Sequence, residues 1–171
     1  MYISPKVWGP SAWRTLHRMS FCIKNKDIAK TFYNTLIYIL PCGTCRTNFS
    51  RHLKNHPITK NIPIWLFEIH NMINQSTGSM IANESELELS KLNCGTHFDD
   101  IFFVENIIKT HPGMHKVSDE YIQALETFLK IWATHSSVKE IPKKLHSRRY
   151  LFAWLRRVAD TYLMLSKKPA I

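Results

Sequence analysis

The segment "YILPCGTCRTNF" (residues 38–49) contains two cysteines three residues apart, directly after a proline, in a chain with four cysteines in all. The residues before it, "DIAKTFYNTLIYIL" (residues 27–40), have the apolar period of an amphipathic helix. We expect Asp27 to be the N-cap of this helix. The helix should end before Pro41, because the residue ahead of a proline is disfavoured in the α region.

A second helix is predicted to begin with Pro41 at its first position, where a missing N–H costs nothing, and to end at His56–Pro57. This register places Cys42 and Cys45 in the first helical turn. Free backbone N–H groups and the helix dipole stabilise a thiolate there. The local sequence therefore predicts a cysteine pair with lowered thiol pKa.

The rest of the chain also favours helices, since it has only five glycines and little alternation of apolar and polar residues. Residues 98–115 are apolar but ambiguous between strand and helix, whereas 118–135 form a clear amphipathic helix with Ser118 as N-cap. The fold class predicted is all-α. Its further helices are expected at residues 11–23, after a Pro10–Ser11 start signal, at 63–75, entered through Pro63, at 84–92 and at 143–166.

Composition suits one domain, or one compact domain with an extension. The chain has 23 Lys and Arg against 13 Asp and Glu, a formal charge of +10. The run from Lys139 to Lys168 has nine basic and two acidic residues, which is typical of a solvated helix face and also suits an acidic partner. We find no nucleic-acid motif, no export signal and no apolar run near 18 residues. These features predict a non-secreted protein without a transmembrane segment or a specific nucleic-acid partner.

A Cys-x-x-Cys has several possible roles. A thioredoxin-like motif needs a preceding strand, which the helical period before Pro41 excludes. A structural zinc site needs two further ligands at finger-like spacing. Cys22 and Cys94 are isolated, and only His52 and His56, at i and i+4, keep a zinc site possible, so we predict no metal.

A redox-active pair in a helical protein needs an electron acceptor, because no side chain can store the two electrons that disulfide formation releases. A flavin is the most plausible acceptor. Flat aromatic rings and polar groups on facing helices would hold it. The candidates are Trp8, Trp13 and His17 near the N-terminus, and His70, Asn71 and Asn74 in the otherwise apolar "IWLFEIHNMIN" (residues 64–74).

Four motifs in order resemble the Erv/ALR family of FAD-dependent sulfhydryl oxidases: "WGPSAWRTLH" (residues 8–17), "LPCGTC" (40–45), "NHP" (55–57) and "WLFEIHNMIN" (65–74). The resemblance covers residues 1–95. It implies a four-helix bundle with a short fifth helix that binds FAD. It also implies a homodimer, usually formed through the first two helices.

The resemblance further implies a role for each matching residue. Cys45 is similar to the flavin-proximal cysteine, and Cys42 to the interchange cysteine that receives electrons from substrate dithiols. Trp13 and His17 would line the flavin, and His70, Asn71 and Asn74 would hold the adenosine portion. The implied activity is disulfide formation in substrate proteins, with electron transfer to O2 giving hydrogen peroxide.

Some features differ from the family pattern. The usual lysine after Asn74 is replaced within "STGSM" (residues 76–80), and Lys91 or Lys109 would have to substitute. Cys22 is expected to be a buried thiol, with pairing to Cys94 as the alternative. No separate shuttle cysteine pair is present, so a direct electron route from a partner to Cys42 is expected.

Residues 96–171 form a second part, predicted to be a helical, basic extension. It either enlarges the core or dimer, or it is a docking platform for another protein. The second possibility gives an alternative function, an oxidase-like protein with weak or no activity in a virion or an assembly. A small oxidase with an extra helical part and no signal peptide resembles the oxidases of large DNA viruses. This resemblance implies that the protein is located in the host cytoplasm or in the virion. A cellular protein would belong in the mitochondrial intermembrane space.

Overall fold

The computed structural model describes residues 3–83, 97–113, 116–136 and 138–166. These residues form helices joined by turns and irregular segments and contain no strand, which confirms the all-α class. The helix predicted at 84–92 lies outside the described residues. The helices are α1 (Pro5–Cys22), α2 (Lys26–Ile39), α3 (Gly43–Asn55), α4 (Ile62–Thr77), α6 (Phe98–Lys109), α7 (Asp119–Thr134) and α8 (Arg148–Ser166).

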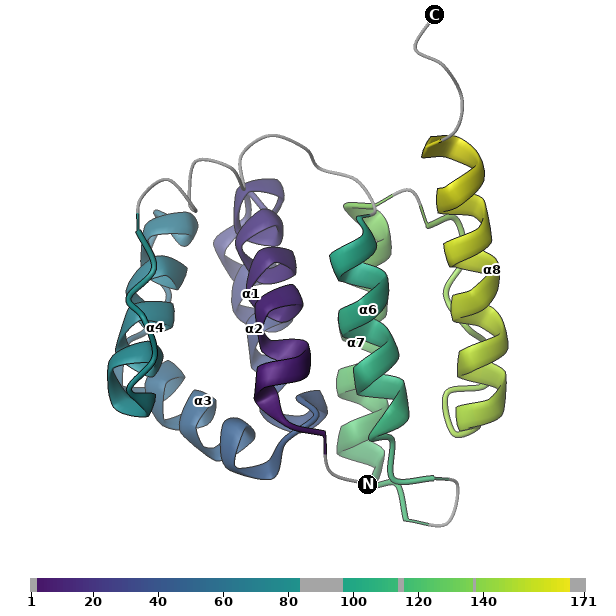
Figure 1. Ribbon diagram of the computed structural model, residues 1–171, viewed down its shortest axis with the longest axis horizontal. Coiled ribbons are helices and arrows are strands. Elements are labelled where there is room, and N and C mark those ends of the chain that lie inside the picture. The colour runs from purple at the N-terminus through teal and green to yellow at the C-terminus, as the bar shows by residue number, and fades with distance from the viewer. Residues whose placement is uncertain (1–2, 84–96, 114–115, 137, 167–171) are drawn as a thin grey trace, which may run out of the picture.

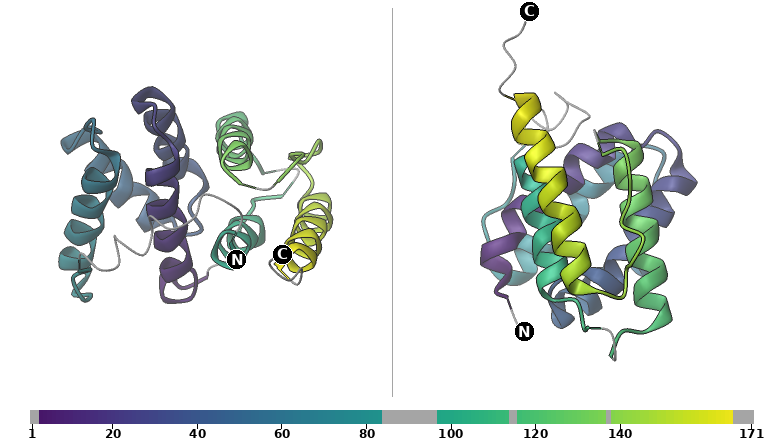
Figure 2. Two further views of the ribbon diagram at one scale, coloured as in Figure 1. Left: turned by 90° about the horizontal axis from the view of Figure 1, so that it is seen from above. Right: turned by 90° about the vertical axis from the view of Figure 1, so that its right-hand side faces the viewer.

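The helices are arranged in layers, with α1 and α2 in a central position (Figures 1 and 2). On one side α4 packs against α1 and α3 packs against α2. On the other side α6 packs against α1 and α7 against α2, and α8 covers α6. The first two helices therefore contact both parts of the chain.

Buried apolar side chains from both parts form one continuous cluster. Phe32 of α2 stacks on Phe128 of α7 with ring centroids 5.0 Å apart, and Trp8 of α1 stacks on Phe103 of α6 at 6.1 Å. The division at residue 95 stays a prediction. The packing shows that residues after 96 complete the covering of α1 and α2.

The first helix begins earlier than predicted, at Pro5, and the start at Pro10–Ser11 is wrong. The Ser4 side chain accepts a hydrogen bond from the Lys6 N–H, and Pro5 takes the first helical position. Pro10 lies inside the helix, in its second turn, where it removes one backbone donor. The buried packing of Trp8 and Ala12 in the same helix offsets this cost. The Ser-Pro pair at 4–5 is the true start signal.

Two further helix starts differ from the prediction. Asn25, not Asp27, caps α2, since its side chain accepts hydrogen bonds from the backbone N–H groups of Asp27 and Ile28. The last helix begins at Arg148 rather than 143, one residue after Ser147, whose hydroxyl accepts from the Tyr150 N–H. The ambiguous segment from 98 is helix α6 through Lys109.

Candidate functional site

The cysteine pair lies at the start of α3, and its register differs from the prediction by two residues. The helix begins at Gly43, so the placement of Pro41 at its first position is wrong. Cys42 is the N-cap in an extended conformation, and its Sγ accepts a hydrogen bond from the Cys45 N–H at 3.2 Å. The pair keeps its position at the positive end of the helix dipole, because an N-cap side chain contacts the same free N–H groups.

Cys42 and Cys45 are joined in a disulfide whose Cα atoms are 5.1 Å apart. Cys42 is 5% exposed, whereas Cys45 is only partly buried. The pair is therefore present in its oxidised form, with the second cysteine the more accessible of the two in the described residues.

Arg46 follows the pair directly and was not predicted as a site residue. Its Nη1 donates to the carbonyl oxygen of Leu40 at 2.6 Å, so the side chain folds back over the turn that presents Cys42. The guanidinium adds a fixed positive charge to the helix N-terminus. The sequence could have indicated Arg46 by its position immediately after Cys45, since a cation near a thiol lowers the pKa of that thiol.

Trp13, His17 and His70 meet between α1 and α4. The Nε2 of His17 and the Nδ1 of His70 share a hydrogen bond of 3.0 Å. The Trp13 ring stacks on His70 with centroids 3.9 Å apart and planes inclined by 16°. Three flat rings from helices far apart in sequence thus form one cluster, as their shared helix faces suggested.

Both histidines of this cluster are neutral at pH 7. Burial lowers the pKa of His17 to about 4. Burial, together with the nearby His17, lowers the pKa of His70 to about 3. The Nδ1 of His17 is buried and has no hydrogen-bond partner among the described residues, which is costly unless a ligand or water satisfies it.

The two predicted asparagines contact the segment that follows α4. The Asn71 side chain exchanges two hydrogen bonds with the backbone of Ala82, at 2.9 and 3.3 Å. The Asn74 amide donates to the Met80 carbonyl oxygen at 2.7 Å. These bonds hold residues 80–82 along α4, beside His70, without bringing the amides into the ring cluster.

Trp8 does not join the cluster. Its ring packs on Phe103 and its Nε1 donates to the Ile3 carbonyl oxygen at 3.2 Å, on the side of α1 that faces α6. Phe67 approaches His17 instead, with centroids 6.4 Å apart. Sequence analysis missed Phe67, although its position three residues before His70 places both on one helix face.

The other candidates have different surroundings. Cys22 is disulfide-bonded, so the expectation of a free thiol is wrong, and Cys94 lies outside the described residues. Lys109 pairs with Glu105 on α6 at 3.0 Å, and Lys91 is not described. His52 and His56 stack at 6.2 Å. In the part of the chain that the structure describes, three His, Cys, Asp or Glu side chains nowhere converge as a metal site would require.

Comparison with known proteins relates the site to a family. The Erv1/Alr family profile matches residues 10–93, which include the cysteine pair and the ring cluster. A probable FAD-linked sulfhydryl oxidase of Acanthamoeba polyphaga mimivirus is 33% identical over 97 residues, 49% of this chain and 68% of that protein. No solved structure matches the chain.

Two further relatives are also viral. An FAD-linked sulfhydryl oxidase of African swine fever virus is 32% identical over 89 residues, 46% of this chain and 75% of that protein. A putative FAD-linked sulfhydryl oxidase of Invertebrate iridescent virus 6 is 32% identical over 102 residues, 48% of this chain and 90% of that protein. The chain therefore belongs to the Erv1/Alr family.

Proposed function

We propose that this chain is an FAD-linked sulfhydryl oxidase that makes disulfides in substrate proteins. The observation that supports it most directly is the Cys42–Cys45 disulfide at the N-terminus of α3, within the residues that match the family. A helix N-terminus stabilises the thiolate that thiol–disulfide exchange requires as a leaving group. Membership of a family whose viral relatives bear this name supplies the reaction type.

The ring cluster fits the cofactor. Trp13, His17 and His70 offer flat surfaces and neutral imidazoles, and the unpartnered Nδ1 of His17 is a polar atom that a ligand could satisfy. Asn71 and Asn74 would act on the adenosine portion indirectly, because their amides hold the backbone of residues 80–82 along α4. A bound FAD would supply the two-electron acceptor that the dithiol needs, with O2 as the final acceptor and hydrogen peroxide as the product.

The protein's own residues perform the exchange with substrate. A substrate thiolate attacks Sγ of Cys42, the S–S bond to Cys45 breaks, and Cys45 leaves as a thiolate. The second substrate thiol, as its thiolate, then attacks the mixed disulfide, which releases oxidised substrate and leaves Cys42 and Cys45 as a dithiol. The N–H groups of the first turn and the Arg46 guanidinium stabilise the sulfur anions.

A docking role is the second candidate, favoured by the exposed side of α8. Arg148, Arg149, Arg156 and Arg157 are exposed, and none of them forms an ion pair with a carboxylate among the described residues. An acidic partner protein would suit this surface. No helix in the described ranges has the length and apolarity to cross a bilayer. With viral relatives, we propose action in the host cytoplasm or in the virion.

Oxygen consumption with a dithiol substrate tests the proposal. The purified protein with bound FAD should consume O2 and release peroxide when dithiothreitol is added. The Cys42→Ser variant should bind FAD as the parent does and consume no O2. A flavin-loaded parent protein without dithiol-dependent O2 uptake would leave the docking role as the better account, and arginine-to-glutamate changes on α8 would then be tested for loss of partner binding.

A further inference from the structure

The last helix repeats the buried pattern of α4. The buried apolar residues of α4 are Ile62, Trp65, Leu66 and Ile69. In α8 Leu151, Trp154 and Leu155 are buried and Val158 is partly buried against the same cluster. The spacing is the same in both helices, and each position has a residue of the same kind. One of these helices lies in the part that matches the family and the other in the part that does not.

The two tryptophans also have the same kind of surroundings. The Nε1 of Trp65 donates to the carbonyl oxygen of His56 at 2.9 Å, and the Nε1 of Trp154 donates to that of Glu140 at 2.9 Å. Both acceptors lie in the segment that leads into the helix. Each indole also makes an edge contact with an aromatic ring of the second helix of its own half, Tyr33 for Trp65 and Trp132 for Trp154.

The contacts between helices also correspond in the two halves of the chain. Suppose that α6, α7 and α8 correspond to α1, α2 and α4, in that order. The contact between α1 and α4 then has an equivalent in the contact between α6 and α8. The contacts of α1 with α6 and of α2 with α7 join equivalent helices, as in a two-fold interface. In Figure 1 these pairs run in opposite directions, and a half-turn about the line of sight exchanges them. Phe32 and Phe128, near the middle of α2 and α7, stack on each other at this interface.

We propose that the C-terminal half is a degenerate second copy of the redox bundle, which takes the place that a second chain would occupy on α1 and α2. The protein then works as a monomer with one redox site. The family resemblance implies a homodimer through α1 and α2, whereas this packing gives a reason to expect a monomer, because α6 and α7 already cover the α1–α2 face.

The second copy keeps the packing residues and lacks the site residues. With α4 and α8 superposed on their tryptophans, His70, Asn71 and Asn74 correspond to Ala159, Asp160 and Leu163. No cysteine follows residue 94, and residues 138–147, at the place of α3, form no helix. Given the proposed oxidase function, the electrons come from a different protein, since no second chain is present to donate them.

The mass of the full chain in solution tests the monomer without reference to activity. Light scattering coupled to size exclusion should give one chain, 20.1 kDa, across a wide range of protein concentration. A two-chain mass would overturn the proposal, whichever surface joined the chains. Because the readout needs no flavin, this result is independent of whether the oxidase function is correct.

A matched pair of variants tests the equivalence of the halves. Trp65→Phe and Trp154→Phe each remove one indole donor from the same setting, so each should lower the unfolding midpoint by a similar amount in one shared transition. A Trp154→Phe protein with an unchanged midpoint, or two separate transitions for the two halves, would overturn it. The monomer mass should persist in both variants.

Discussion

The two sides of α1 differ in their chemistry, although the residues concerned are sequence neighbours. His17 faces α4 and meets another neutral imidazole, His70, with one buried nitrogen left without a partner among the described residues. Arg18, the next residue, faces α6 and pairs with Asp100. The α4 side thus has two neutral imidazoles, and the α6 side has a buried ion pair. Arg18 Nε and Nη1 and Asp100 Oδ1 have no further hydrogen-bond partner among the described residues.

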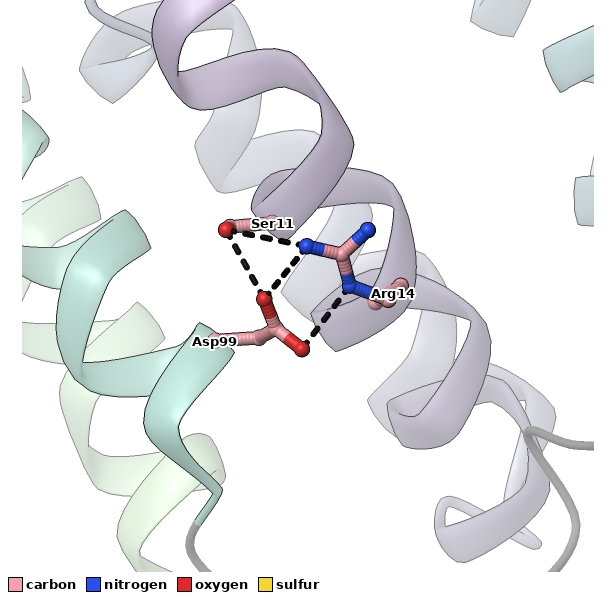
Figure 3. A network of polar contacts seen from close by, with 3 residues as sticks. All are labelled: Ser11, Arg14 and Asp99. Atoms are coloured by element: carbon pink, nitrogen blue, oxygen red, sulfur yellow. Dashed lines mark hydrogen bonds and ion pairs between the residues drawn. The ribbon is translucent and has the colours of Figure 1, made fainter.

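The α6 side contains two ion pairs of different burial. Figure 3 shows the exposed one, in which Arg14 donates to both carboxylate oxygens of Asp99, at 2.7 and 2.8 Å, and Ser11 donates to the same carboxylate. In the buried one the side chains of Arg18 and Asp100 are 6% and 0% exposed, and the Trp132 Nε1 also donates to Asp100 at 3.3 Å.

This difference indicates a division of work on one helix. Paired charges on the α6 side join the C-terminal half to α1, whereas the neutral rings on the α4 side form the surface that we propose for the cofactor. Changes on the α6 side should therefore affect stability, and changes on the α4 side and at the cysteine pair should affect turnover.

Loss of the second cysteine should have the largest effect. Cys45→Ser should reduce dithiol-dependent O2 uptake on the order of 1,000-fold or more, because the exchange has no disulfide to open. Its unfolding midpoint should change little, since the disulfide closes only a short loop. Steady-state O2 uptake and thermal unfolding measure the two effects. Activity retained within about tenfold would contradict the assignment of the pair.

Removal of the buried cation should be the largest effect on stability. Arg18→Met leaves the Asp100 carboxylate buried without its counter-ion and should cost about 3–5 kcal/mol of unfolding free energy. Urea unfolding measures this cost. O2 uptake per folded molecule should stay near that of the parent protein. A cost below about 1 kcal/mol would show that the α6 side is not held by this pair.

Acidification should destabilise the α4 side. The folded pKa values of His17 and His70, about 4 and about 3, lie below the 6.5 of an exposed histidine. The unfolded chain therefore binds protons first as the pH falls. Stability is complete above about pH 6.5 and declines as the pH falls toward about 4, by up to several kcal/mol for the two groups together.

Other histidines also titrate in this range, since the pKa values of His52, His111 and His135 are lowered too. The difference in unfolding free energy between the parent and a variant that lacks His17 and His70 removes their contribution. Urea unfolding of the flavin-free parent and of a His17→Gln, His70→Gln variant should be compared at each pH. The parent should lose stability faster between pH 6.5 and pH 4, by the order of magnitude given above. If the unfolding free energy fell equally fast with pH in both proteins, burial would not be what keeps His17 and His70 neutral.

The exposed ion pair should have the smallest effect and is the matched control for Arg18. Arg14→Met should cost less than about 1 kcal/mol, because water and salt screen the exposed guanidinium. The cost should shrink further in high salt. A cost as large as that of Arg18→Met would remove the distinction between the buried and exposed pairs.

The helical fold and the meeting of the three rings between α1 and α4 could largely be predicted, because both depend on the spacing of residues close together in the sequence. The i, i+4 spacing of Trp13 and His17, and the place of His70 on an apolar helix, predicted that these rings share faces. The all-α class and the ends of α2 and α3 followed from helical periods and from prolines. The roles of these residues stay predictions.

The rest depends on contacts between distant residues, which spacing does not give. Trp8 looked like a site residue by proximity to Trp13, yet it faces Phe103 of α6. Asn71 looked free to bind a ligand, yet Ala82, eleven residues later, satisfies its amide. Capping chemistry was also ambiguous, since Asn25 and Asp27 are both good N-caps and only the backbone geometry chooses between them.

The absorption spectrum of the purified protein, reconstituted with FAD and freed of excess cofactor, tests the central claim most directly. We expect the visible bands of a bound oxidised flavin, one per chain, which bleach when dithiothreitol is added without O2 and return when O2 is admitted. A folded protein that stays colourless after reconstitution, or whose bound flavin does not respond to dithiol, would contradict it.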